Sequence, residues 1–128
     1  MSLKILDDLN FDPIKKKIVI EEYNNTKDNI LEIIERFNFV NREKLYALAA
    51  EKYPELLIGK VEVFTTIPID VFINLSTIPL VETKHHLYIA TINTQIKNVI
   101  QELKKYTNKE IIIVNSNYKD VIAALNEL

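Results

Sequence analysis

The chain has 128 residues, of which 48% are hydrophobic and 27% charged, with one glycine and no cysteine. That length suits one globular domain with a single core, and the lack of cysteine excludes a small disulfide-rich scaffold. With a formal net charge of -2, the chain lacks the positive field that nucleic-acid binding normally needs, so we expect no DNA or RNA partner.

Residues 1–25 precede the first clear helical spacing of apolar residues, and we interpret them as an N-terminal arm or short strand. Three consecutive lysines, Lys15 to Lys17, come directly before the apolar run Ile18 to Ile20. The lysines could contact anionic lipid or phosphate, but five acidic residues between positions 7 and 22 offset their charge. A solvated flank beside a strand is the favoured interpretation.

Residues 26–55 are predicted to form a helical hairpin. From Thr26 onward, apolar residues recur at the spacing of one buried helical stripe, and Asn25 or Thr26 is suited to cap this helix. Asn41 is suited to cap a second helix, which Pro54 ends because the residue before a proline avoids helical angles. The two predicted stripes are Ile30, Ile33, Ile34 and Phe37, then Leu45, Leu48 and Ala49.

Strand-like patterns follow in residues 56–92. Val61 and Val63 alternate with Glu62, which predicts a strand, and Ile67 to Asp70 begin a short helix or an extended crossing. Two further apolar runs, Ile78 to Val81 and Leu87 to Ile92, are separated by a polar stretch, and this arrangement predicts a β-hairpin. Its loop would present Lys84, His85 and His86.

The last forty or so residues predict a strand, helix, strand and helix. Asn93 or Thr94 is suited to cap a helix whose apolar face carries Val99 and Leu103. Ile111 to Val114 is apolar on both faces, as in a central strand, and Asn115 or Ser116 would cap a closing helix. The expected fold class is therefore α/β (α+β): an N-terminal helical hairpin packed on a small mixed β-sheet, with a C-terminal β-α-β-α unit.

The sequence offers no catalytic motif. Neither a P-loop nor a Rossmann fingerprint can be written from Gly59 alone, and adjacent His85 and His86 project to opposite sides of a strand, which disfavours a metal site. We expect no enzyme activity from this chain, no metal and no cofactor. No window reaches the roughly 18 apolar residues of a membrane span, and a signal-peptide pattern is lacking, so we expect a cytoplasmic protein without membrane insertion.

Three stretches carry a family resemblance. The first is the helical pair, with Ile33-Ile34, the break at 38–40 and Leu45-x-x-Leu48-Ala49. The second is Ile78-Pro79-Leu80 followed by residues 87–93. The third is residues 103–114 followed by Val121-Ile122-x-x-Leu125. Together, residues from about 29 to 128 resemble the N-terminal domain of the assembly ATPases of type II secretion and type IV pilus systems. We therefore expect residues 26–128 to form such a domain, with the hairpin in 26–55 and the sheet and its helices in 56–128.

The resemblance implies a non-catalytic domain that docks its ATPase on the cytoplasmic part of an inner-membrane scaffold protein. Some family members bind cyclic di-GMP through an Arg-Leu-Gly start, a glycine in the turn and a glutamine at the end of the second helix. Here Asn29-Ile30-Leu31, Asn38 and Lys52 stand at those positions. Because glycine lets a backbone approach a ligand closely, we expect that cyclic di-GMP is not bound.

For the expected partner interface we single out Phe37, Phe39 and Tyr46, near the first turn, although each is also suited to the core. The protein would then stay at the inner membrane through its partner. The alternative is a stand-alone small-ligand or nucleotide sensor. In that case Lys84, His85 and His86 at the hairpin tip would hold an anion together with the cap at Asn93-Thr94.

Overall fold

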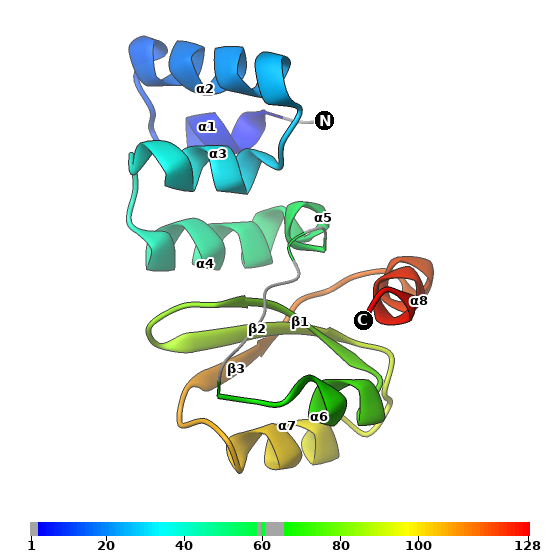
Figure 1. The fold of residues 1–128 in the computed structure, drawn as a ribbon. Helices are drawn as coiled ribbons and strands as arrows, with labels where there is room; N and C mark the ends of the chain where they lie inside the picture. Colours follow the sequence, from blue (N-terminus) through cyan, green and yellow to red (C-terminus); the bar gives the residue numbers. More distant parts are fainter. Residues whose placement is uncertain (1–2, 59, 61–65) are drawn as a thin grey trace.

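The computed structural model describes residues 3–58, 60 and 66–128. Within these residues, eight helices surround a three-stranded mixed sheet, and the predicted α+β fold class is confirmed (Figure 1). Helices α1 to α5 lie on one side of the sheet, α6 and α7 lie on the other, and α8 packs beside β1. The helices are α1 (Lys4–Asp8), α2 (Pro13–Thr26), α3 (Ile30–Phe37), α4 (Arg42–Lys52), α5 (Pro54–Leu57), α6 (Ile69–Asn74), α7 (Ile96–Lys104) and α8 (Tyr118–Asn126).

Two apolar clusters fill the space on either side of the sheet. The larger one joins α1 to α5 and α8 with one face of the strands, and includes Ile5, Ile34 and Tyr88. The smaller one lies between the other face and the pair α6 and α7, and includes Phe72 and Leu103. The sheet is therefore covered on both faces, as its apolar strands require.

The N-terminal residues are helical, so the interpretation of an arm or short strand is wrong. The Asp12 side chain accepts a hydrogen bond from the Lys15 N–H at 2.8 Å, and Pro13 occupies the first turn of α2. These are strong signals of a helix start. The run Ile18 to Ile20 resembles a strand because β-branched residues favour strands, but only Val19 of the three is fully buried.

The short helix α1 is held against the helical hairpin. Ile5 and Leu6 are buried in the larger cluster. The Tyr53 hydroxyl donates a hydrogen bond to the Asp8 carboxylate. This bond, together with burial and the nearby carboxylates, raises the pKa of Tyr53 to about 12. Residues 3–25 thus belong to the packed structure.

The helical hairpin of α3 and α4 is confirmed, with one cap corrected. Because α2 runs through Thr26, helix α3 begins at Ile30 and is capped by Asn29, not by Asn25 or Thr26. The Asn29 side chain accepts from the Leu31 N–H at 2.8 Å and donates to the Leu56 carbonyl at 2.9 Å. Asn41 caps α4 as predicted, and α4 ends at Lys52 before Tyr53-Pro54.

Asn38 follows α3 in the left-handed conformation, with φ 55° and ψ 40°. Asparagine and glycine adopt these angles more readily than other residues do, because a Cβ atom otherwise crowds the backbone. We expect Asn38→Gly to leave the free energy of unfolding within about 0.5 kcal/mol, and Asn38→Ala to lower it by about 1 kcal/mol. Urea unfolding of the two variants checks this, and equal values would contradict the assigned turn.

The sheet contains a hairpin and a parallel pair. Strand β1 (Thr77–Glu82) pairs antiparallel with β2 (His86–Thr91), which pairs parallel with β3 (Glu110–Ile113). The predicted hairpin and the β2-α7-β3-α8 unit are therefore confirmed.

The prediction that residues 111–114 form a central strand is not met among the described residues, where the strand order β1-β2-β3 places β3 at an edge. Ile111 packs on the smaller cluster and Ile112 on the larger one, so both faces of this edge strand are covered, which explains its apolar sequence.

The remaining predictions concern short connections. Residues 67–70 lead into a short helix, α6, and not an extended crossing. Neither Asn93 nor Thr94 is the N-cap of α7, which is Gln95, although Asn93 accepts from the Gln95 N–H at 2.8 Å. The N-cap of α8 is Asn117, not Asn115 or Ser116. The predicted strand at Val61 to Val63 lies outside the described residues.

Candidate functional site

Two of the three predicted interface residues lie together at the turn between α3 and α4. The rings of Phe37 and Phe39 are stacked, with centroids 5.5 Å apart and planes at 16°. Both are half-buried. Tyr46 has no exposed surface and belongs to the larger core cluster. Its assignment to a partner interface is corrected: Tyr46 is a core residue.

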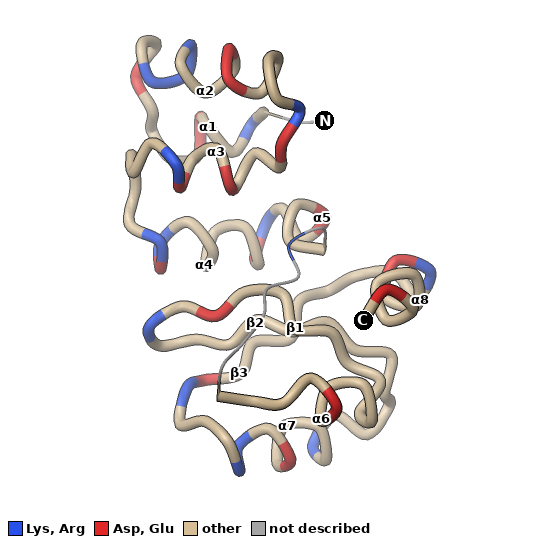
Figure 2. The backbone as a smooth tube through the Cα atoms, viewed as in Figure 1, with Lys and Arg blue, Asp and Glu red and all other residues tan. Residues whose placement is uncertain are grey.

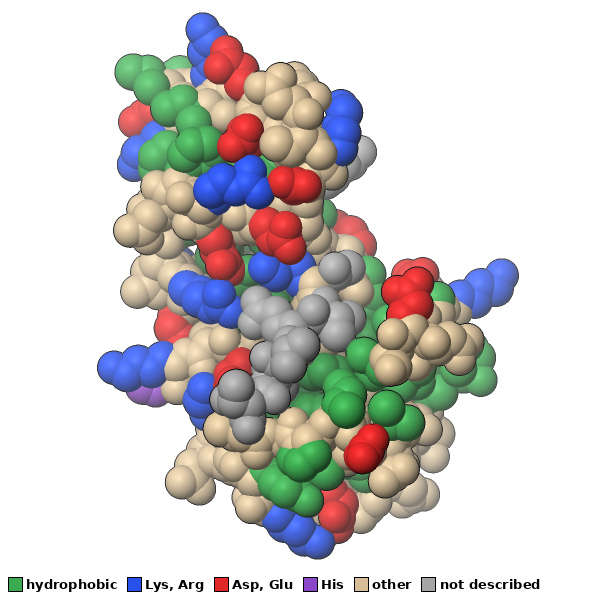
Figure 3. Space-filling view, in the orientation of Figure 1, with side chains coloured by type: hydrophobic (Ala, Val, Ile, Leu, Met, Phe, Trp, Pro, Cys, Tyr) green, Lys and Arg blue, Asp and Glu red, His purple; other side chains and the backbone are tan. Residues whose placement is uncertain are grey.

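The start of α2 adds further residues to this surface. Phe11 meets Phe39 edge to face at 5.8 Å, and the Lys15 ammonium lies 5.4 Å from the Phe39 centroid. Ile14, which precedes Lys15, is 72% exposed. We call the group Ile14, Lys15, Phe37 and Phe39 the aromatic surface. Figure 3 shows hydrophobic side chains gathered at the upper left, over the start of α2 and toward α3.

The sequence interpretation missed Ile14 and Lys15, because residues 1–25 were not recognised as helical. The signal that identifies them is Asp12-Pro13, an N-cap followed by a first-turn proline. Since α2 then packs on α3, its first turn comes close to the α3–α4 turn.

A polar network surrounds the buried Tyr46. Its hydroxyl donates to Glu35, which also receives the Arg42 Nη1 group at 3.1 Å. Arg42 Nη2 donates to the Glu82 carbonyl at 3.1 Å, and the Lys60 ammonium lies 3.9 Å from Glu35. Figure 2 shows that both acidic and basic residues are distributed along the helices of this part of the chain. Each cation of the network around Tyr46 faces a carboxylate. The network therefore joins α3, α4 and β1.

The tip of the β-hairpin is engaged by α4. His86 Nδ1 lies 2.9 Å from Glu43 Oε2, and His86 Nε2 lies 3.4 Å from Glu110 Oε2. Glu43 Oε1 accepts from the His85 N–H at 2.7 Å. Burial alone would raise the pKa of Glu43, but hydrogen bonds from His86, the His85 amide and Thr83 outweigh it and lower the pKa to about 2.

The structure separates the two parts of the alternative anion site. His86 begins β2, whereas Asn93 comes after the strand has ended, so Lys84 to His86 and Asn93-Thr94 lie at opposite ends of β2. Asn93 is also engaged, since its side chain donates to the Leu75 carbonyl at 3.1 Å. The small-ligand alternative therefore loses its proposed site.

The described part of the chain holds neither a metal-binding cluster nor a membrane-spanning helix. No group of three or more His, Cys, Asp or Glu residues there is placed to hold a metal ion. None of the helices described has the length and apolar character needed to span a membrane.

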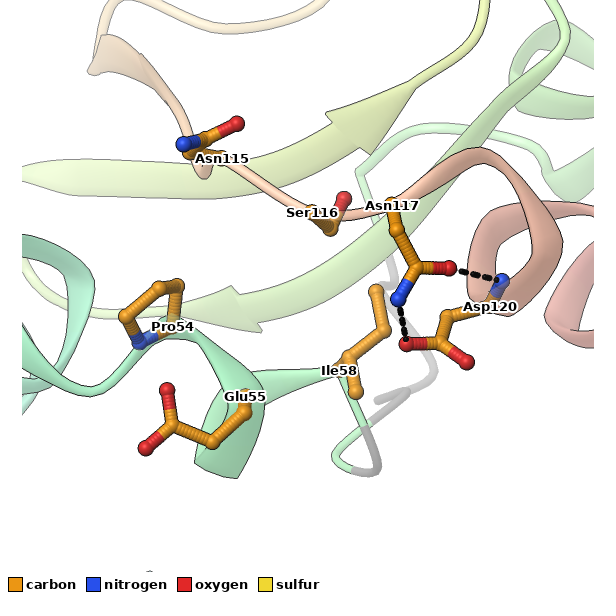
Figure 4. A pocket seen from close by; sticks show the side chains of 7 residues that line it. All are labelled: Pro54, Glu55, Ile58, Asn115, Ser116, Asn117 and Asp120. Carbon is orange, nitrogen blue, oxygen red and sulfur yellow. Dashed lines mark hydrogen bonds between the residues drawn. The ribbon is translucent and has the colours of Figure 1, made fainter.

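A groove lies between α5 and the start of α8, far from the aromatic surface (Figure 4). Its hollow of about 350 Å³ is lined by Pro54, Glu55, Ile58, Asn115, Ser116, Asn117 and Asp120. Figure 4 shows Glu55 and Asp120 on opposite sides, with Ile58 between them. Sequence patterns could not reveal this groove, because its two walls come from distant parts of the chain.

Comparisons with known proteins give a loose structural likeness. No family model matches the chain, and the search of curated proteins gives no significant match. A solved structure, "Structure of MshE with cdg", matches 96% of this chain and 94% of its own, with 10% identity and a TM-score of 0.38.

The expectation that cyclic di-GMP is not bound is contradicted, because the matching MshE structure contains cdg, the cyclic dinucleotide. Asn38, which stands at the turn where those family members have glycine, adopts the left-handed conformation, with φ 55°.

Proposed function

We propose that this chain is a non-catalytic docking domain that tethers a type II secretion or type IV pilus assembly ATPase to its inner-membrane platform. The observation that carries the proposal is the aromatic surface, where the Phe37 and Phe39 rings stack, Lys15 lies over Phe39, and the neighbouring Ile14 on the first turn of α2 is exposed. The partner is the cytoplasmic domain of an inner-membrane scaffold protein, which keeps this cytoplasmic chain at the membrane. The sequence resemblance supplies the choice of partner.

The aromatic surface has the properties of a protein interface. Stacked aromatic rings are rigid, so they lose little conformational entropy when a partner covers them. Ile14 keeps 72% of its surface in water, and its burial in an interface would contribute roughly 1 to 2 kcal/mol. Lys15 supplies a positive charge beside the rings, which favours an acidic residue on the partner.

Ile14→Asp is expected to weaken binding of the scaffold's cytoplasmic domain at least about tenfold, since a carboxylate would have to be desolvated in the interface. Isothermal titration calorimetry with the purified domain measures the dissociation constant. Stability should be nearly unchanged, because the side chain is exposed. Parallel titrations with cyclic di-GMP present would measure any effect of that ligand on docking.

Ile69→Asp on α6 is the matched control, because Ile69 is 44% exposed and lies at the opposite end of the molecule. This variant should bind like the unmodified chain. Phe39→Asp is a less clean test, since Phe39 is half-buried against Phe11 and its loss also disturbs packing. Equal affinities of the Ile14 and Ile69 variants would contradict docking through the aromatic surface.

A further inference from the structure

We propose that the groove between α5 and α8 binds a basic amphipathic segment of a partner protein. This acidic groove combines the hollow described above with its extension along α8, which adds Ala123, Ala124 and Glu127. It shares no residue with the aromatic surface, so the proposal stands independently of the docking function above.

The acidic groove is a continuous hollow. A second space of about 320 Å³ extends the one in Figure 4 along α8, and the two share Glu55, Ile58 and Asp120. Ile58 is half-buried between the walls, and the second space is bordered by Ala123 and Ala124. Small alanine side chains leave room for a partner's side chains beside α8, over an apolar surface.

The charge of the acidic groove selects a cationic occupant. Glu55 lies on one wall, Asp120 and Glu127 lie on the other, and all three residues are exposed. Among the described residues that border the two hollows there is no lysine or arginine. Three carboxylates around an apolar floor would repel an anion and attract lysine or arginine side chains.

The N-terminus of α8 is already capped by its own side chains. Asn117 Oδ1 accepts from the Asp120 N–H at 2.9 Å, and Asn117 Nδ2 donates to Asp120 Oδ2 at 2.7 Å. The first-turn amide that would otherwise attract an anion is thus engaged. An elongated hollow with an apolar floor and an acidic rim fits a helix that carries apolar residues on one face and lysines beside them.

A fluorescein-labelled 14-residue helical peptide of leucine and lysine serves as the probe, with fluorescence anisotropy as the measurement. We expect the double variant Glu55→Gln with Glu127→Gln to bind it at least about fivefold more weakly and with less salt dependence. Ala123→Arg, which adds both bulk and positive charge to the groove, should weaken binding further. The matched control is Glu21→Gln with Asp70→Asn, which removes two exposed charges elsewhere.

Amide NMR shifts locate the peptide, and those of Ile58, Ala123 and Ala124 are expected to change most. Ile14→Asp should leave the peptide affinity unchanged, so failure of this proposal is distinguishable from failure of docking through the aromatic surface. Equal weakening by the groove and control variants would overturn the proposal. So would equal binding of a peptide in which glutamate replaces lysine.

Discussion

Ile34→Ala is expected to lower the free energy of unfolding by about 3 kcal/mol, because it leaves a cavity where a fully buried side chain stood. Ile34 is 0% exposed and lies in the cluster that joins α1 to α5 with the sheet. In a chain of this size such a loss lowers the melting temperature by roughly 10 °C. Urea and thermal unfolding followed by circular dichroism measure both quantities.

Ile14→Ala provides the comparison for the same chemical change at a solvated site. Because Ile14 is 72% exposed, we expect its truncation to change the free energy of unfolding by less than about 0.5 kcal/mol. A similarly small effect at Ile34 would mean that the apolar stripe of α3 does not form the core.

Glu43→Gln is expected to cost about 1 to 2 kcal/mol near neutral pH, because it weakens a charge-assisted contact to His86 and the bond from the His85 amide. The pKa of Glu43 is lowered from 4.5 to about 2 in the folded state. Its stabilising contribution is therefore complete above pH 4.5 and is lost as the pH falls toward 2. The difference between variant and unmodified chain should shrink across that window.

The measurement is urea unfolding of both proteins at several pH values between 2 and 7. Glu51→Gln is the matched control, since Glu51 lies on the same helix but is exposed. We expect the control to show almost no pH-dependent difference. A constant effect of Glu43→Gln throughout the acidic range would contradict the stabilising role assigned to its charge.

Elements with regular apolar spacing could be predicted from the sequence. The stripe of Ile30, Ile33 and Ile34 identified α3, and two apolar runs separated by a polar loop identified the hairpin of β1 and β2. The N-terminal helices were missed because Ile18 to Ile20 has no helical period, whereas the informative signal was the single pair Asp12-Pro13.

Features that depend on tertiary neighbours could not be obtained in this way. An apolar run such as Ile111 to Ile113 reports that both faces of a strand are covered, but not whether another strand lies beside it. Phe37 and Phe39 were found because they flank a recognisable turn. Tyr46 was misplaced because its buried hydroxyl is satisfied by Glu35 from another helix, a pairing with no sequence signature.

The strand order β1-β2-β3 follows the order of the chain, and this has a consequence for folding. Residues 77–113 can assemble the whole sheet through local connections, which favours rapid formation. Helix α8 must then return to β1 from beyond β3, and it has one fully buried side chain, Val121. We expect α8 to dock late in folding and to detach early in local unfolding, so the acidic groove would be the last surface feature to form.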